Sequence, residues 1–208
     1  MIVYSATRQQ FTADVYSNQI ERRILDAFQT RLKKSVGPGD LAAWRHSMQH
    51  MNNVLVAGEI APDAGVAIEY TIPQSAKRID FILTGKDDQR RDTAVIVELK
   101  QWTEAQATDR DAIVETIIGG AMREVMHPSY QAWTYAALIR DYNESAQDDR
   151  IRLVPCAYLH NCTTPESIRS AFYRDHTDRA PAFVKGDADR LKRFIQQHVY
   201  NGDSDGIL

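Results

Sequence analysis

The sequence has no long hydrophobic run. No stretch approaches the roughly 18 apolar residues that a membrane-spanning helix needs. The opening residues, Met1 to Ser5, show neither the basic start nor the long apolar segment of a signal peptide. We therefore expect a protein without a membrane partner, located in the cytoplasm.

Cysteine is scarce as well. The chain holds 2 cysteines, Cys156 and Cys162, which lie on either side of His160. Their spacing fits neither the paired ligands of common zinc sites nor a redox motif. We interpret both as reduced thiols with a structural role.

A strong excess of one charge is also missing, since 25 Lys and Arg stand against 28 Asp and Glu, for a net charge of −3. Such a chain has no bulk attraction to a polyanion, so any binding of nucleic acid must come from a local surface. What remains is an ordinary globular composition of 208 residues, 43% of them hydrophobic. We expect one domain over residues 1–200, followed by a polar tail or the start of a linker over 201–208.

Helical periodicity marks the first part of the chain. Apolar residues recur at helical spacing from Phe11 to about Lys34, and Asp40 is placed to cap a second helix that ends at Gly58. Glu21 lies on or beside the apolar stripe of the first helix, so its carboxylate needs a partner. Two interpretations stay open for Glu21: a boundary residue that reaches solvent or pairs with a base, and an acid of a metal site.

Three strands follow, over residues 66–72, 78–83 and 93–100, and they indicate an antiparallel meander. Glu69, in the first strand, shares a face with Ala67 and is expected to face solvent; the alternative is a position close to Asp80.

Charged residues interrupt the second and third of these strands. In the third, the period of two places Glu98 and Lys100 on one face. In the second, Asp80 points away from the face that holds Phe81, so pairing of the strands brings Asp80 near Glu98. The sequence therefore predicts an Asp, Glu and Lys cluster at one end of a sheet, a donor set that suits a hard cation such as Mg²⁺.

The stretch after these strands is less regular. A short β-prone run, Ile113 to Ile118, precedes two glycines and a loop that carries Arg123 and His127 and ends at Pro128. A loop beside a metal site is a natural place for phosphate contacts, so we take Arg123 and His127 as candidate substrate-binding residues. A surface loop with incidental bases is the alternative.

A helix is expected from Ser129 to about Asp141. It carries Gln131 and Tyr135 four residues apart, hence on one face. The amide and the phenol together can hold a phosphate or a water, but the spacing alone equally describes a half-buried face.

The last third of the chain completes the expected sheet. A nearly continuous apolar strand from Ile151 to Leu159 belongs near the sheet centre. Phe183 and Val184 indicate a short edge strand, and Asp187 is placed to cap a final helix.

Taken in order, these residues resemble a known family. Asp80, then Glu98-Leu99-Lys100, then Gln131 with Tyr135, resemble the PD-(D/E)xK nuclease superfamily, especially its RecB-like branch with the Q-x-x-x-Y motif. Glu21 sits where many members place another metal-site acid. The resemblance implies an α/β fold with a restriction-endonuclease-like αβββαβ core, in which a mixed central sheet is flanked by helices. Ile79 replaces the proline of the family's name, a departure that is common in the superfamily.

A closer resemblance covers nearly the whole chain. It is to the amino-terminal nuclease-like domain of bacterial proteins that continue into a Schlafen-type superfamily 1 DNA/RNA helicase, and it is carried by residues 63–70, 77–82, 97–102 and 127–133. The chain has no G-x-x-x-x-G-K-[ST] phosphate loop, so it carries no ATPase motor of its own. Two interpretations stay open: a stand-alone nuclease, and the amino-terminal domain of a longer protein. Nucleic acid is the expected partner, and the second interpretation adds a helicase domain or subunit.

The resemblance implies metal-dependent hydrolysis of a phosphodiester. We expect DNA as the substrate, although the sequence itself does not distinguish DNA from RNA. Asp80, Glu98 and the backbone carbonyl of Leu99 would hold Mg²⁺ or Mn²⁺, and Glu21 would bind a second ion or a metal water. Lys100 would orient the attacking water or offset charge on the phosphate.

Gln131 and Tyr135 complete the implied catalytic set by positioning the nucleic-acid strand.

Two other interpretations stay open for the acidic cluster. One is a salt-bridged patch on the solvated face of a sheet, and the other is a catalytically silent nucleic-acid-binding or regulatory domain of a helicase.

Overall fold

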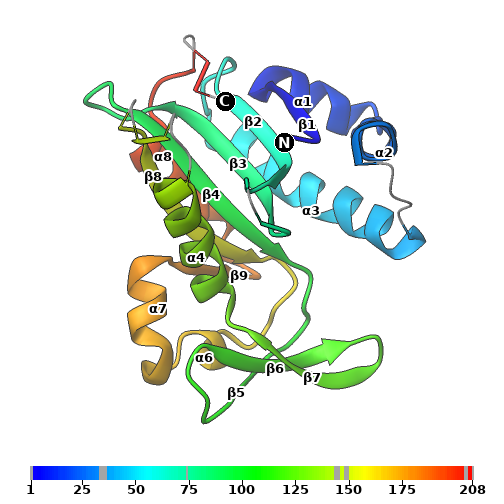
Figure 1. Cartoon of the computed structure of the whole chain (residues 1–208), viewed down its shortest axis with the longest axis vertical. Coiled ribbons are helices and arrows are strands. Elements are labelled where there is room, and N and C mark those ends of the chain that lie inside the picture. The colour runs from blue at the N-terminus through cyan, green and yellow to red at the C-terminus, as the bar shows by residue number, and fades with distance from the viewer. Residues whose placement is uncertain are drawn as a thin grey trace.

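The computed structural model describes residues 2–32, 37–73, 75–142, 146–147, 150–203 and 206–207. Its centre is a six-stranded sheet in the order β1-β2-β3-β4-β8-β9 (Figure 1). Strands β1 to β4 pair antiparallel with their neighbours, whereas β8 runs parallel to β4 and β9 parallel to β8. The strands are β1 (Tyr4–Thr7), β2 (Gly65–Thr71), β3 (Arg78–Lys86), β4 (Asp92–Lys100), β8 (Arg152–Leu159) and β9 (Ala182–Val184).

Helices cover both faces of this sheet, so the fold is α/β with a mixed central sheet flanked by helices, as expected. In Figure 1, α4 crosses in front of β4 and β8, α8 lies behind them, and α1 to α3 gather beyond β2. The helices are α1 (Arg8–Tyr16), α2 (Ile20–Leu32), α3 (Pro38–Ala57), α4 (Pro128–Tyr142), α6 (Pro165–Ile168), α7 (Arg174–Arg179) and α8 (Ala188–His198), with a 3₁₀ turn η1 (Ala171–Tyr173).

The alternation of side chains along the strands divides the core between the two faces. Phe81 and Val97 join the cluster formed with α1, α2, α3 and α8, whereas Ile82 and Ile96 join the cluster under α4. These side chains are almost fully buried, and each contributes about 1.5–3 kcal/mol to folding. Burial on both faces explains why β3 and β4 tolerate polar residues only at their ends.

The start of the chain differs from the expectation. One helix was expected from Phe11 to about Lys34, but the structure has two, because Asn18 adopts a left-handed φ of 54° between α1 and α2. Lys34 lies outside the described residues. The second expected helix is confirmed as α3, which begins at Pro38, two residues before Asp40.

A second, smaller sheet projects below the main body in Figure 1. It consists of β5 (Gln106–Ala107), β6 (Ile113–Ile118) and β7 (Ala121–Met126). Strands β6 and β7 form a hairpin whose two-residue turn, Gly119 and Gly120, has φ values of 62° and 79°, the conformation of a type I′ turn that glycine adopts without strain. The expected loop after the glycines is therefore wrong: it is strand β7.

The end of the chain returns to the sheet. The backbone of Asn201 bridges to Lys86, and the Thr84 hydroxyl donates a hydrogen bond to Asp203 over 2.5 Å. Residues 204, 205 and 208 of the expected tail lie outside the described residues. Among the helices that the structure describes, none is both long enough and apolar enough to cross a bilayer.

Candidate functional site

Strand pairing brings Asp80 and Glu98 together. Phe81 pairs with Val97 in the antiparallel register of β3 and β4, so the next residue outward on each strand is Asp80 and Glu98. On β4, Glu98 and Lys100 continue the row of Ala94 and Ile96 toward the α4 side. The predicted convergence of the acidic and basic side chains is thus present at the end of the sheet.

Hydrogen bonds hold this cluster in place. The backbone N–H of Leu99 donates to Asp80 Oδ2 over 2.9 Å, and Lys100 Nζ donates to Glu98 Oε1 over 2.6 Å. Glu98 is only 2% exposed, and its second oxygen, Oε2, is buried without a hydrogen-bond partner. A buried carboxylate oxygen without a partner is costly unless a proton shared with Asp80 or a cation compensates it.

The electrostatics of the cluster follow from this burial. Burial, followed by the charge of Asp80, raises the pKa of Glu98 to about 8, although Lys100 opposes the shift. Burial also raises the pKa of Asp80, against the lowering effects of Lys100 and the Leu99 N–H. Burial alone would lower the pKa of Lys100, but the charges of Glu98 and Asp80 raise it on balance. Near neutral pH the carboxyl pair therefore retains a proton that a cation would displace.

The QxxxY pair of α4 faces the same cluster. Gln131 Nε2 donates to the Tyr135 hydroxyl over 2.8 Å. Burial and then the charge of Glu98 raise the pKa of Tyr135, which places the phenol within electrostatic reach of the carboxylates. Because Gln131 satisfies the phenol oxygen as an acceptor, the phenol proton stays available for a further acceptor in the site.

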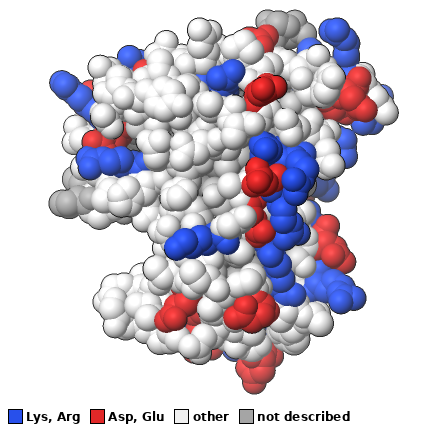
Figure 2. Space-filling view, turned by 180° about the vertical axis from the view of Figure 1, so that it is seen from behind, with Lys and Arg blue, Asp and Glu red and all other residues white. Residues whose placement is uncertain are grey.

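A pocket of about 650 Å³ opens beside the cluster. It lies between α3 and the tip of the β6–β7 hairpin, and Figure 2 shows the corresponding hollow between the main body and the lobe that the hairpin forms. Its lining contains charged, polar and apolar residues: Ala43, Trp44, Ser47, Met48, Glu69, Asp80, Leu99, Lys100, Gln101, Trp102, Thr103, Ile117 and Ile118.

Glu69 lines this pocket together with Asp80, and its surroundings differ from the expectation. It was expected to face solvent beside Ala67, but it is buried, with Trp44 Nε1 donating to it over 2.8 Å and Arg78 Nη1 at 2.8 Å. Its φ of 55° breaks the strand alternation, so that Ala67 and Tyr70 both face α4 while Glu69 turns toward α3. A glutamate gives no sequence signal of a left-handed backbone, which is why the alternation misplaced it.

Glu21 is not brought to the pocket. Arg45 on α3 holds its carboxylate with two hydrogen bonds, one of them from Nη2 to Oε1 over 2.6 Å. Of the two interpretations of Glu21, the structure therefore favours a boundary glutamate that pairs with a base over an acid of the metal site. The physical reason is the approach of α2 to α3, which supplies the arginine.

The two candidate substrate-binding residues also lie elsewhere. His127 is fully buried, with Nε2 donating to the Ile168 carbonyl over 2.9 Å and Nδ1 accepting from the Ser129 N–H over 3.2 Å. Burial lowers the pKa of His127 to about 4, so the ring is neutral with both nitrogens engaged and is not a phosphate ligand. Arg123 is exposed on β7, opposite Thr116, and does not line the pocket.

The residues of the cluster fit a hard divalent cation. They offer two carboxylates, one with an unpartnered buried oxygen, and Mg²⁺ is commonly bound through one or two carboxylates together with waters and substrate phosphates. Within the described part of the chain, no group of three or more His, Cys, Asp or Glu side chains is arranged to hold a metal ion. The protein would thus supply Asp80 and Glu98, and solvent and substrate would supply the remaining oxygens.

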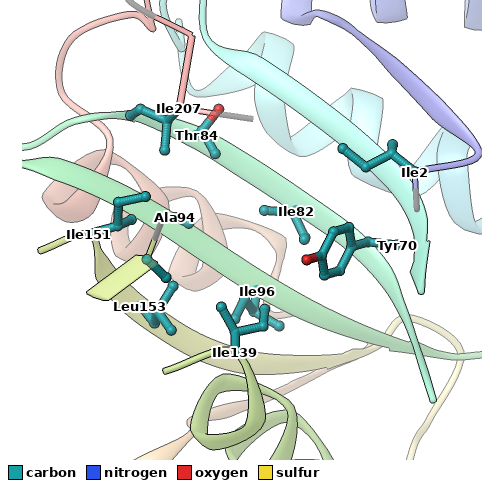
Figure 3. A pocket seen from close by; sticks show the side chains of 11 residues that line it. Ile2, Tyr70, Ile82, Thr84, Ala94, Ile96, Ile139, Ile151, Leu153 and Ile207 are labelled. Atoms are coloured by element: carbon teal, nitrogen blue, oxygen red, sulfur yellow. The ribbon is translucent and has the colours of Figure 1, made fainter. Parts of the chain in front are cut away.

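A second pocket, of about 170 Å³, lies on the α4 face of the sheet. Figure 3 shows its walls, which are mainly aliphatic side chains such as Ile82, Ile96 and Ile139, with the Tyr70 hydroxyl as one of few polar groups. Charged side chains do not line it, in contrast to the pocket beside Asp80.

Comparison of the chain with protein-family models, with curated proteins and with solved structures gave no significant match. The function is therefore inferred from the geometry of the site and from the sequence motifs that it brings together.

Proposed function

We propose that this protein is a Mg²⁺- or Mn²⁺-dependent nuclease of the PD-(D/E)xK type that hydrolyses phosphodiester bonds in DNA. The observation that carries this proposal is the buried pair Asp80 and Glu98, with the unpartnered Glu98 Oε2 beside the ammonium of Lys100. Paired carboxylates with a lysine two residues further on are the residue set that the superfamily motif requires.

A solvated salt-bridge patch does not account for these contacts. Such a patch would leave its charges exposed, whereas Glu98 is almost fully buried and Lys100 is only 18% exposed. Burial of two carboxylates beside one ammonium leaves an excess of negative charge, which destabilises the fold unless a proton or a cation compensates it. Functional sites maintain such arrangements, and structural salt bridges seldom do.

The order of elements supports the same proposal. Leaving the hairpin aside, α3, β2, β3, β4, α4 and β8 follow one another in the order of an αβββαβ core. The motif residues then fall on its second strand, its third strand and its second helix.

Each residue of the cluster has a role in the proposed reaction. Asp80 and Glu98 would hold the cation, which when bound stabilises negative charge on the phosphate and makes water more acidic. Lys100 supplies a positive charge that attracts the phosphate and offsets the charge that develops on it. Gln131 orients the Tyr135 phenol, whose proton is free to contact a phosphate oxygen.

A catalytically silent nucleic-acid-binding domain, acting with a helicase, is the second candidate. It is favoured by one observation: within the described residues, no third metal-binding side chain joins Asp80 and Glu98. The two candidates differ in their response to metal, because a silent domain retains its affinity for DNA in EDTA and never cuts.

Cleavage assays separate the candidates. Wild-type protein should cut at least one of plasmid, linear duplex and single-stranded DNA with Mn²⁺, and EDTA should stop the reaction. Asp80→Ala and Lys100→Ala should abolish cutting while far-UV circular dichroism stays unchanged, and Asp189→Ala, an exposed acid on α8, serves as the matched control. Cutting by Asp80→Ala at the wild-type rate would refute the assignment.

A further inference from the structure

Arginines surround a hollow at the end of the sheet opposite the acidic cluster. The hollow has a volume of about 580 Å³, and the described residues that line it are Arg90, Arg91, Asp92, Arg150 and Arg152. It forms where the turn between β3 and β4 meets the start of β8, since Thr93 and Arg152 are partners in the parallel pairing of β4 with β8. Arginines from two distant parts of the sequence thus line one hollow.

A buried aspartate fixes one of these arginines. Asp87 is fully buried, and its Oδ1 accepts hydrogen bonds from the backbone N–H groups of Gln89 and Arg91, each over 2.9 Å. Its Oδ2 accepts one from Arg91 Nε over 2.8 Å, and Arg91 Nη2 lies 2.7 Å from the same oxygen. A guanidinium carries more N–H donors than these contacts use, so Arg91 is held in place and retains donors for a second acceptor.

The two aspartates beside the hollow are already matched by cations. Arg152 Nη1 lies 3.8 Å from Asp87 Oδ2, so this one carboxylate faces both Arg152 and Arg91. Lys86 Nζ donates to Asp92 Oδ1 over 2.6 Å, which balances the carboxylate that lines the hollow. Neither carboxylate therefore offsets the other arginines of the lining.

Arg90 and Arg150 add positive charge that the described residues do not balance. Both are exposed, and no ion pair within the described part of the chain joins either of them to a carboxylate. The hollow is thus a local concentration of positive charge in a chain whose net charge is −3. Such a concentration attracts anions, and it lowers the free energy of an anion bound between the guanidinium groups.

This hollow is separate from the acidic cluster. Strand β4 has 9 residues, from Asp92 at the hollow to Lys100 at the cluster, and at about 3.3 Å per residue its two ends lie about 26 Å apart. Figure 1 shows the turn between β3 and β4 at one end of the sheet and the β6–β7 hairpin beyond the other. Between the two ends, the α4 face of the sheet presents aliphatic side chains such as Ala94, Ile96 and Leu153 (Figure 3). The arginines therefore form a confined group at one end of the sheet.

We infer that the hollow binds the oligophosphate group of a small molecule, either a free inorganic oligophosphate or a nucleotide. A planar guanidinium matches the geometry of phosphate oxygens and binds them in a bidentate manner. A triphosphate gathers several such oxygens and charges in a compact group, as several guanidinium groups around one hollow require. The inference goes beyond the proposed nuclease function and does not depend on it.

The arrangement favours a small ligand over a nucleic-acid backbone. Proteins that bind nucleic acid neutralise phosphates along a strand, whereas these arginines surround a single hollow. Its volume of about 580 Å³ lies within the usual range of small-molecule sites, roughly 300–1,000 Å³. Among the described residues of the lining, none is aromatic, so recognition depends on the phosphates and not on stacking of a base.

Isothermal titration calorimetry in EDTA tests the inference in the absence of metal. Wild-type protein should bind tripolyphosphate saturably and at least about tenfold more tightly than inorganic phosphate, because a single phosphate engages fewer guanidinium groups. ATP distinguishes the two sources of the ligand. Affinity for ATP at least about tenfold above that for tripolyphosphate identifies a nucleotide, and equal or lower affinity identifies a free oligophosphate.

The chain offers a matched pair of double variants. Arg90→Gln with Arg150→Gln should weaken tripolyphosphate binding at least about tenfold, since two charged hydrogen-bond donors are lost. Arg22→Gln with Arg123→Gln removes the same charge from exposed positions outside the hollow. In about 0.1 M salt, where charges are screened beyond about 10 Å, this control should retain the wild-type affinity within about twofold.

Three results would overturn the inference. One is the absence of saturable tripolyphosphate binding by wild type, and another is an equal loss of affinity in the two double variants. The third is an oligonucleotide that binds more tightly than tripolyphosphate and loses its affinity in Arg90→Gln with Arg150→Gln, because the hollow would then hold a nucleic-acid backbone. Cleavage and metal binding at Asp80 take no part in these measurements, so either proposal can fail without the other.

Discussion

Replacement of Glu98 by glutamine isolates the energetic effect of the buried carboxyl pair. Glutamine keeps the shape of the side chain but removes its charge, so the metal-free protein no longer confines two carboxylates at the end of β3 and β4. We expect Glu98→Gln to fold normally and to change the pH dependence of stability in a defined direction.

The direction of this pH dependence follows from the pKa values of Glu98 in the folded and the unfolded protein. Its pKa is about 8 in the folded protein and about 4.3 in an unfolded chain. Between these values the folded state binds a proton that the unfolded state does not, so Glu98 makes the free energy of unfolding fall as pH rises from about 4.5 to 8.

The size of the effect is several kcal/mol at most. Each pKa unit corresponds to about 1.4 kcal/mol, so the full shift would be worth about 5 kcal/mol. Because the titration of Glu98 is coupled to Asp80 and Lys100, the observed effect should be smaller. We expect the free energy of unfolding of wild type to fall by about 2–4 kcal/mol relative to that of Glu98→Gln across this pH range.

Urea denaturation in EDTA at pH 5 and pH 8 measures this quantity for both proteins. Buried histidines such as His127 and His160 act in the opposite sense, but they are common to wild type and variant and cancel in the difference. If the difference in unfolding free energy between the two proteins is the same at both pH values, the pKa of Glu98 is not raised in the folded protein.

Three further predictions follow from the contacts around the site. Tyr135→Phe should lower the cleavage rate, measured by single-turnover kinetics, by about 10–100-fold. Its melting temperature, measured by calorimetry, should stay within a few degrees of wild type. An unchanged cleavage rate would show that the phenol takes no part in the reaction. Glu21→Ala should leave the cleavage rate unchanged, since its carboxylate is occupied by Arg45, and a large loss of cleavage would restore it to the metal site. Burial lowers the pKa of His160 to about 4; its stabilising effect is present above pH 6.5 and is lost as pH falls toward 4, so His160→Gln should flatten the acid side of the stability profile.

The cluster could be predicted from the sequence because it depends on local rules. The period of two along a strand fixes the face of Glu98 and Lys100, and adjacent strands of a meander pair with each other. The expected antiparallel β2 to β4 are confirmed for the same reason, and the expected helix α4 and edge strand β9 are confirmed as well.

The sequence predicted the wrong surroundings for Glu21, Glu69 and His127, because their positions depend on contacts between distant parts of the chain. Arg45 comes to Glu21 from another helix, and the carbonyl that fixes His127 belongs to Ile168, far along the sequence. The left-handed backbone of Glu69 is stabilised by its contacts to Trp44 and Arg78, which periodicity alone does not reveal.

Titration of Mn²⁺ into wild type and Asp80→Asn by isothermal calorimetry at pH 8 tests the central claim most directly. Loss of an outer-shell partner already weakens metal binding by about 10–100-fold, so loss of Asp80 as a ligand should weaken Mn²⁺ binding at least about tenfold. Saturable Mn²⁺ binding by wild type that falls by this factor in Asp80→Asn is the predicted result. Equal binding by the two proteins, or none by wild type, would contradict the account of the carboxyl pair as a metal site.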